Sequence, residues 1–187
     1  MPPKIKITKK EIVDTALEIV RTGGAQALNA RTIASLLHCS TQPIFSNFAT
    51  MELLHREVIR EATALSQEYA QREIACGDHP TYKATGMAYI RFAKEEPELF
   101  KLLYMCDRAG TPLPEGDKDT EDIESLVQRN TGLGQTDAKL FHLEMWAFVH
   151  GIATMFATGF LDLDWQLVSK MLTDAYLGLR KQYEKEG

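Results

Sequence analysis

Apolar residues recur at intervals of three and four along nearly the whole chain. This spacing places them on one side of an α-helix, whereas strands alternate apolar and polar positions. Alternating runs are nearly absent from the sequence. The pattern therefore predicts an all-α protein of about nine helices.

Three short helices are predicted in the first quarter of the chain. The run Thr8-Lys9-Lys10-Glu11 has the form of a capping box and predicts a first helix that stops at Gly23-Gly24. Asn29 and Ser40 are the side chains expected to cap the next two helices. These helices are expected over residues 30 to about 37 and about 41 to 47.

Six further helices are predicted after the short ones. Thr50 is expected to cap a fourth helix over residues 51 to about 76, while Pro80 and Pro97 open the fifth and sixth. Gly110, Pro112, Pro114 and Gly116 indicate a loop over residues 107–119. The remaining ranges expected for helices are about 80–95, 97–105, 120–130, 136–159 and 163–184.

Composition describes an ordinary soluble globular chain. It has 187 residues, of which 44% are hydrophobic and 25% charged. Cys39, Cys76 and Cys106 are few, odd in number and scattered, so reduced thiols in a cytoplasmic protein are expected and a zinc site is not. No secretory signal is expected. The stretch from Met145 to Leu161 has no charged residue, and we interpret it as a buried helix rather than a membrane span.

Charge is distributed unevenly along the chain. Residues 1–48 carry six Lys and Arg against three Asp and Glu, a net charge of +3 within a total of −5. The remainder therefore carries −8. A basic N-terminal quarter on an acidic protein indicates contact with a polyanion, although a solvated basic tail would give the same count.

The second and third predicted helices are separated only by Leu37-His38-Cys39-Ser40. Two short helices joined in this way have the geometry of a helix-turn-helix. Ala34 supplies the small residue needed where the helices cross. His38 falls at the turn position that takes a left-handed backbone, which His adopts more readily than most residues other than Gly.

Four runs of residues carry a more specific signal: 15–20, 27–34, 40–48 and 52–54. Together they resemble the DNA-binding domain of the TetR family of transcriptional regulators over about the first 55 residues. The resemblance extends to residues 146–153, which are similar to a Trp, His, Gly signature of the family's eighth helix. It implies a helix-turn-helix domain over residues 1–50 and a helical effector-binding and dimerisation domain over residues 51–187. The helix over residues 51–76 would connect them.

The resemblance also implies which residues meet double-stranded DNA. Gln42 is the best candidate to read a base, because an amide can pair with adenine through two hydrogen bonds. Two departures from the family pattern weaken phosphate contacts: Phe45 replaces a tyrosine, and Met51 replaces a lysine. The candidate DNA-binding residues are Lys4, Lys6, Arg31, Thr32, Thr41, Gln42, Pro43, Phe45, Ser46, Asn47 and Thr50.

The predicted C-terminal domain is expected to bind a small hydrophobic or aromatic effector and a second copy of the chain. Its last two helices are apolar around much of their circumference, so a second side must be buried in a homodimer. The candidate effector-binding residues are Tyr89, Phe92, Phe100, Tyr104, Met105, Trp146 and His150. The candidate dimer residues are Leu143, Ala147, Gly151, Val168, Met171, Leu172 and Ala175.

Two other classes of function are less well supported by the sequence. Glu52 and His55 have the Glu-x-x-His spacing of a di-iron bundle, but a second copy of that motif is absent. No phosphate loop or nucleophile elbow is present, so we expect neither catalysis nor a cofactor. An all-helical scaffold that binds a partner protein without DNA is the alternative to a ligand-responsive repressor that binds a palindromic operator.

Overall fold

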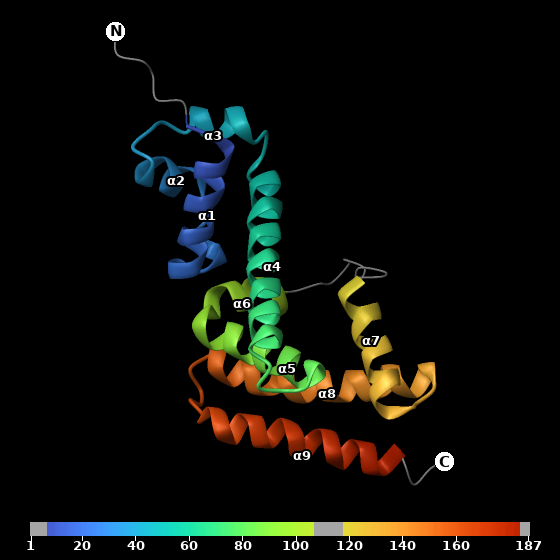
Figure 1. Ribbon diagram of the computed structural model, residues 1–187. Helices are drawn as coiled ribbons and strands as arrows, with labels where there is room; N and C mark the ends of the chain where they lie inside the picture. The colour runs from blue at the N-terminus through green and yellow to red at the C-terminus, as the bar shows by residue number, and fades with distance from the viewer. Residues whose placement is uncertain (1–6, 107–117, 184–187) are drawn as a thin grey trace. The chain divides into compact units, whose positions relative to one another are not determined.

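The computed structural model describes residues 7–106 and 118–183 (Figure 1). Within them every regular element is helical, as the sequence predicts. The predicted loop at 107–119 lies almost wholly outside the described residues. The helices are α1 (Lys9–Gly23), the short 3₁₀ helix η1 (Ala25–Ala27), α2 (Ala30–Leu36), α3 (Gln42–Asn47), α4 (Met51–Cys76), α5 (Thr81–Glu95), α6 (Pro97–Tyr104), α7 (Lys118–Thr131), α8 (Gln135–Ala157) and α9 (Trp165–Tyr183).

Packing divides the chain into two compact units. The N-terminal unit comprises residues 1–67 and 96–106, and the C-terminal unit comprises residues 68–95 and 107–187. The division falls within α4 and assigns α6 to the N-terminal unit. The boundary expected on functional grounds, between residues 50 and 51, stays a prediction.

Helix α1 organises the N-terminal unit. Its capping box is complete, since the Glu11 N–H donates to Thr8 Oγ1 at 3.2 Å and the Thr8 N–H donates to Glu11 Oε2 at 2.8 Å. The Thr8 N–H and the Thr8 hydroxyl both donate to Glu11 Oε2 and lower the pKa of Glu11, because they favour the ionised carboxylate. The buried side of α1 carries Ile12, Ala16 and Val20, and the helix contacts α2, α3 and α6.

Of the three side chains predicted to cap α2, α3 and α4, two make the expected hydrogen bonds. Asn29 Oδ1 accepts the N–H groups of Arg31 and Thr32 at 3.1 and 3.0 Å, and the Leu53 N–H donates to Thr50 Oγ1 at 3.3 Å. The prediction for Ser40 is wrong. Thr41 is the N-cap of α3, has helical backbone angles and makes no side-chain cap hydrogen bond.

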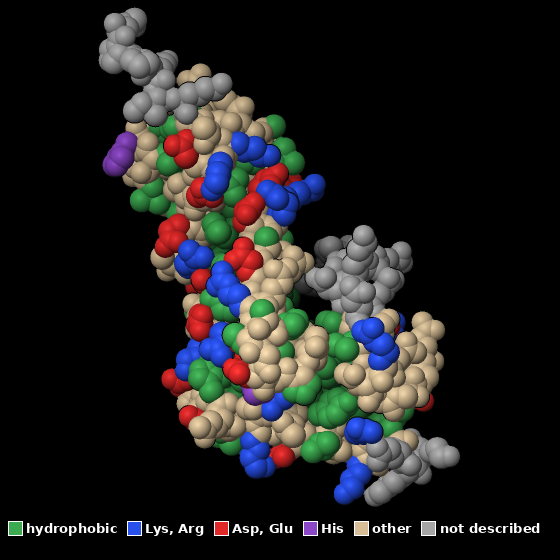
Figure 2. Space-filling model, viewed as in Figure 1, with side chains coloured by type: hydrophobic (Ala, Val, Ile, Leu, Met, Phe, Trp, Pro, Cys, Tyr) green, Lys and Arg blue, Asp and Glu red, His purple; other side chains and the backbone are tan. Residues whose placement is uncertain are grey.

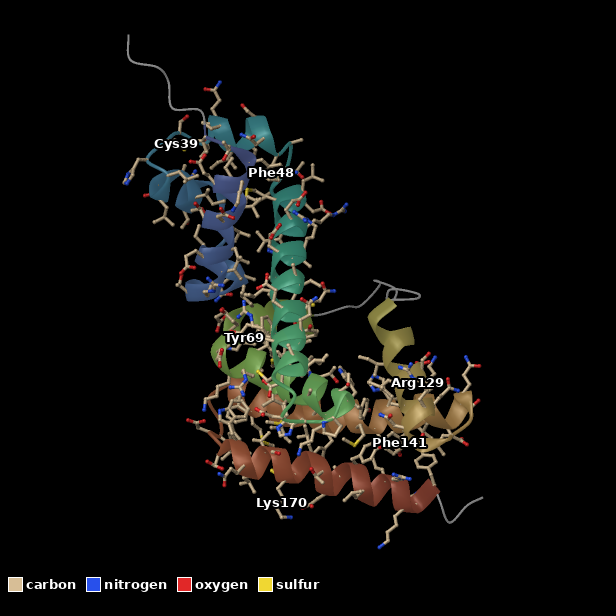
Figure 3. The ribbon with its side chains drawn as sticks, in the orientation of Figure 1. Cys39, Phe48, Tyr69, Arg129, Phe141 and Lys170 are labelled. Carbon is tan, nitrogen blue, oxygen red and sulfur yellow. The ribbon has the colours of Figure 1, made fainter. Side chains whose placement is uncertain are left out.

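The C-terminal unit is built around α8. Helix α8 contacts α5, α7 and α9, and α5 and α9 also contact each other (Figure 1). Phe141, labelled in Figure 3, is fully buried in a cluster with Val127 and Met145. At Gly86 on α5 an added Cβ would lie 3.1 Å from the Leu172 side chain, so this glycine permits close packing against α9.

Helix α8 is long and apolar enough to cross a membrane by length and composition alone. Its most apolar window has a mean hydropathy of 1.2, and 39% of that window is buried inside the protein. A core helix of a soluble protein meets the same criterion. Helix α8 contacts three other helices but buries only one side, so the predicted buried helix describes that side alone, while Trp146 and Phe148 are exposed.

Candidate nucleic-acid interface and C-terminal surfaces

The turn between α2 and α3 has helix-turn-helix geometry. His38 has a φ of 51°, which confirms the left-handed backbone expected at this position. The Cys39 N–H donates to the Ala34 carbonyl at 2.9 Å and fastens the turn to α2. Ile44 and Phe48, the latter labelled in Figure 3, are buried at 0% and 3% exposure and hold α3 in the core of the unit.

The opposite side of α3 is open to solvent. Gln42, Phe45, Ser46 and Asn47 are exposed, whereas the predicted contacts Thr41 and Pro43 are half-buried. The Ser46 hydroxyl donates to the Gln42 carbonyl at 2.9 Å. Asn47 Nδ2 donates to the Pro43 carbonyl at 2.8 Å. Gln42 makes no side-chain hydrogen bond within the described residues, so its amide is free to pair with a base.

Three further predicted DNA contacts lie where helices begin. Arg31 and Thr32 occupy the first turn of α2, and Thr50 precedes α4. Arg31 and Thr50 are exposed, and Thr32 is half-buried. The first backbone N–H groups of a helix carry partial positive charge and favour phosphate nearby. Lys4 and Lys6 lie outside the described residues.

The positive charge of the N-terminal quarter is largely neutralised by neighbouring carboxylates. Lys9 pairs with Glu57 at 3.0 Å, Lys10 with Asp14 at 2.6 Å, and Arg21 with Glu96 at 2.8 Å. Figure 2 shows blue and red side chains side by side on the visible face of this unit. Among the described Lys and Arg residues up to position 48, Arg31 alone has no ion pair. A count of charges could not reveal this, because Glu57 and Glu96 are distant in sequence.

Apart from Glu144, the exposed residues of α8 between positions 140 and 148 are apolar. Leu143 is 56% exposed and Trp146 is 43% exposed, and Ala147 lies beside them. A Cβ added at Gly151 or Gly178 would meet nothing within 4 Å, so neither position is crowded. Large apolar side chains that are exposed on α8 and α9 are Leu140, Leu143, Trp146, Phe148, Leu167 and Leu177.

The predicted dimer residues of α9 need correction. Val168 and Leu172 are 0% and 3% exposed, so they belong to the core of the C-terminal unit rather than to an outward surface. Ala175 is half-buried against the Phe141 cluster, and Met171 is half-buried. The outward side of α9 carries Leu167 and Gly178 instead. Leu167 lies four residues before Met171, and Gly178 lies seven residues after it. The helical period therefore places all three on one side of α9, and this spacing could have identified the outward side from the sequence.

The predicted effector residues do not all share one environment. Phe100, Tyr104 and Met105 belong to the N-terminal unit, and the other four belong to the C-terminal unit. Phe92 and Phe100 are fully buried, whereas Met105 is 41% exposed. Tyr104 Oη lies 3.1 Å from Ser66 Oγ, and its ring lies 5.2 Å from that of Phe100.

Three of the predicted effector residues form a continuous row in the C-terminal unit. Tyr89 Oη on α5 lies 2.9 Å from Nδ1 of His150 on α8. The His150 ring stacks on Trp146 with a centroid distance of 4.9 Å and an interplanar angle of 17°. Burial lowers the pKa of His150, because the imidazolium loses hydration.

A second Tyr–His pair joins the same two helices. Tyr82 Oη on α5 lies 3.1 Å from Nδ1 of His142 on α8. Burial raises the pKa of Tyr82 and lowers that of His142, while Glu124 on α7 opposes the shift at His142. The tyrosines are seven residues apart and the histidines eight. The two pairs therefore lie about two turns apart along the α5–α8 contact.

One open groove of about 480 Å³ lies in the C-terminal unit, between the end of α4, α5 and α9. Most of its lining residues are polar or charged, although Met87 and Trp165 also line it, and none of the seven predicted effector residues does. Arg91 pairs there with Glu73 at 3.1 Å and lies 4.6 Å from the Trp165 ring centroid. Among the described residues no group of three or more His, Cys, Asp or Glu is arranged to hold a metal ion.

Comparisons with known proteins agree on one family. Residues 82–175, half of the chain, match the family model described as the C-terminal domain of tetracyclin repressor-like proteins. No curated protein sequence matches the chain. A TetR-like transcriptional regulator from Rhodococcus sp. RHA1 has a similar structure, with 12% identity, full coverage of both chains and a TM-score of 0.65. A TetR family member from Streptomyces coelicolor A3 is 19% identical over 89% of this chain and 96% of its own, with a TM-score of 0.62.

Proposed function

Because the chain belongs to the TetR family of transcriptional regulators, we propose that it is a repressor that binds a palindromic DNA operator as a homodimer. A small hydrophobic or aromatic effector would release it. The observation that carries the proposal is the two-sided character of α3. Ile44 and Phe48 anchor the helix in the core, and the exposed Gln42 amide has no side-chain partner within the described residues.

Gln42 is the proposed base reader, and the residues around it hold the helix in place. Its amide can donate to N7 and accept from N6 of adenine, which is a pairing that distinguishes this base in the major groove. Thr41, Pro43 and Ser46 would contact adjacent bases or their methyl groups. Asn47 is tied to the Pro43 carbonyl, so its role would be limited to a nearby phosphate.

Arg31 is the proposed principal phosphate contact of the described residues. Lys9, Lys10 and Arg21, the other described cations up to residue 48, are already paired with carboxylates, so these three would release fewer counterions from DNA than their charge suggests. Thr32 lies in the first turn of α2 and Thr50 directly precedes α4, so the backbone N–H groups at these helix N-termini would face the same DNA sugar-phosphate backbone. Phe45 lies on the exposed side of α3 but has no hydroxyl to donate to a phosphate.

Homodimerisation would bury the outward sides of α8 and α9. Leu143 and Ala147 on α8, with Leu167 and Met171 on α9, form apolar surface, and Gly151 and Gly178 leave room for close approach. In a two-fold dimer each residue on this surface would meet the same surface of the other copy. Two copies would then present two recognition helices to the two halves of a palindrome.

Effector control would act through the C-terminal helices. A ligand changes DNA affinity only by as much as it prefers one of two conformations, so a preference worth about 3 kcal/mol would weaken binding roughly a hundredfold. Phe92 is fully buried and the Tyr89–His150–Trp146 row lies beside α5, so an apolar ligand would have to separate packed helices. Compounds that quench Trp146 emission and release operator DNA together would support this mechanism.

Selection of bound sequences from a random duplex pool tests the DNA function directly. We expect a palindrome, with half-sites separated by about one helical turn. Gln42→Ala should cost about 1 to 3 kcal/mol at one base pair of each half-site and relax specificity there. Arg31→Ala should weaken binding to all sequences and reduce the salt dependence.

Gln71→Ala provides the matched control, because Gln71 is an exposed glutamine on α4 outside the recognition helix. It should leave the selected sequence and the affinity unchanged. If Gln42→Ala selected the same sequence with the same affinity as the unmodified protein, the assignment of Gln42 as reader would be wrong. If the pool yielded no enriched sequence, the proposed operator binding would fail.

A further inference from the structure

The open groove between the end of α4, α5 and α9 is lined by two facing rows of side chains. The row on α5 is Lys83, Met87 and Arg91, and the row on α9 is Trp165, Ser169 and Thr173. The rows run in opposite directions, because Lys83 Nζ donates to Thr173 Oγ1 at 2.8 Å and Arg91 lies over the Trp165 ring. The end residues of each row are separated by about 12 Å at the helical rise per residue. The groove is therefore long enough for an elongated small molecule.

Three Lys and Arg side chains line the groove, and two of them are already neutralised. Arg91 pairs with Glu73 at 3.1 Å, and Lys170 pairs with Asp174. Lys83 makes no ion pair with a described residue, although it is half-buried. Lysine is seldom taken out of water without a charged partner. The groove therefore presents one positive charge that no carboxylate of the described residues balances.

The groove also has unused hydrogen-bond donors. The Lys83 ammonium carries three N–H groups, and its hydrogen bond to Thr173 uses one of them. The half-buried Ser169 hydroxyl, one turn before Thr173, makes no hydrogen bond with a described residue. Asp78 also lines the groove, but it is exposed to water and makes no ion pair with Lys83. A ligand carboxylate, whose two oxygens only accept, could meet both the ammonium and the hydroxyl.

We propose that this groove binds a small monocarboxylate with an apolar tail. The carboxylate lies at Lys83 and Ser169, and the tail extends over the buried Met87 toward Trp165. A single unpaired cation matches a single negative charge, so a monocarboxylate suits the groove better than a phosphate monoester, which carries nearly two. The volume of about 480 Å³ is within the range of sites for small molecules.

This site is distinct from the one proposed for an apolar effector. None of the seven predicted effector residues lines the groove. The proposed occupant is also of a different kind, because its charge fixes its orientation. Occupation of the groove does not depend on operator binding, so the two proposals can fail separately.

Binding of 4-phenylbutanoate to the full chain, measured by isothermal titration calorimetry at pH 7.5, tests the proposal. This probe joins a carboxylate to a phenyl ring through a flexible chain. We expect saturable binding with a dissociation constant of about 1 mM or lower, which is ordinary for so small a ligand. The amide 4-phenylbutanamide has nearly the same shape without the charge. It should bind at least about tenfold more weakly, because it loses the charge-assisted hydrogen bonds.

Lys83→Gln keeps an N–H donor but removes the charge, and should weaken binding of the acid about tenfold while leaving that of the amide unchanged. Ser169→Ala is the second variant, because its hydroxyl makes no hydrogen bond with a described residue that folding would lose. It should weaken binding of the acid roughly fivefold. Lys139→Gln is the matched control. Lys139 is an exposed lysine of α8 that has no ion pair with a described residue and does not line the groove, so binding should be unchanged.

Tryptophan emission locates the bound probe. In a Trp146→Phe background, emission reports on Trp165 alone and should change with the dissociation constant found by calorimetry. In a Trp165→Phe background, the emission of Trp146 should not respond, because Trp146 does not line the groove. The apolar effector of the proposed function is expected to give the opposite result.

Each possible result supports or overturns the proposal. Saturable binding that depends on the carboxylate, on Lys83 and on Ser169 would support it. The absence of saturable binding at millimolar concentration, or equal binding of the acid and the amide, would overturn it. Binding that Lys83→Gln leaves unchanged would place the probe elsewhere and would overturn it as well. None of these results alters the outcome of operator selection, which tests the proposed function separately.

Discussion

Helices α3 and α8 both bury one side and expose the other, but they expose opposite kinds of surface. The exposed side of α3 carries Gln42, Ser46 and Asn47, whose polar groups have fixed directions. The exposed side of α8 carries Leu143 and Trp146, whose attraction to a partner has no direction. The difference indicates that α3 suits a partner with ordered donors and acceptors, whereas α8 suits a partner that is itself apolar.

The largest expected effect concerns the buried side of α3. Phe48→Ala should destabilise the N-terminal unit by about 3 to 5 kcal/mol, because a fully buried aromatic ring leaves a cavity. Phe45→Ala removes the same ring from the exposed side of the same helix and should change stability by less than about 0.5 kcal/mol. Urea unfolding followed by circular dichroism compares them. Equal losses would show that α3 does not have distinct inner and outer sides.

The next effect concerns the apolar side of α8. Leu143→Glu should raise the dimer dissociation constant at least about a hundredfold, because two carboxylates would meet at the two-fold contact without partners. Operator affinity should fall with it. Phe160→Ser removes an apolar side chain that is 75% exposed in the turn after α8, outside the apolar side of that helix, and should leave the mass measured by light scattering unchanged. A dimeric Leu143→Glu protein would place the interface elsewhere.

A smaller effect should sharpen the assignment of the exposed side of α3. Phe45→Tyr adds a hydroxyl that can donate to a DNA phosphate, and should tighten binding by about 1 kcal/mol, or roughly fivefold. Since a phosphate contact is independent of sequence, operator and unrelated duplexes should gain equally in mobility-shift titrations. A gain restricted to the operator would instead identify residue 45 as a base contact.

The smallest expected effect concerns His142, which contacts Tyr82 where α8 packs against α5. His142 has a lowered pKa in the folded protein, so folding is disfavoured once the unfolded chain binds a proton that the folded chain binds less readily. The free energy of unfolding should therefore be highest above pH 6.5, the ordinary pKa of histidine, and should decline as the pH falls from there toward the lower pKa of folded His142. Thermal melts between pH 7.5 and 5.5 should show this decline, and His142→Gln should reduce it. An unchanged slope would exclude His142 as its source.

Local signals in the sequence were sufficient for the helices of this protein. The capping groups of Thr8, Asn29 and Thr50 act within three residues of their own position, so their effect can be deduced without knowledge of the fold. The left-handed turn at His38 was predictable for the same reason. The prediction that Ser40 caps α3 was wrong because Thr41 occupies the N-cap position. The backbone of Thr41 is already helical, so the Ser40 side chain is not at the cap position.

The orientation of the last two helices could not be predicted in the same way. A helix that is apolar around most of its circumference satisfies several rotations equally well, and only its neighbours select one of them. In α9 the space beside Gly86 receives Leu172, which turns Leu167 outward. The row from Tyr89 to Trp146 was only partly predictable. Trp146 and His150 lie about one turn apart on α8, but Tyr89 comes from α5, and the sequence carries no signal that pairs it with His150.

The short lengths of α2 and α3 affect how the helix-turn-helix folds. With seven and six residues, both are well below the roughly 12 to 15 residues that an isolated helix needs to persist in water. Each therefore depends on tertiary packing: α1 contacts both helices, and Ile33 and Ile44 are buried. Backbone amide protons of α2 and α3 should therefore exchange with solvent at one common rate, that of the opening of α1, with no faster local opening of the recognition helix.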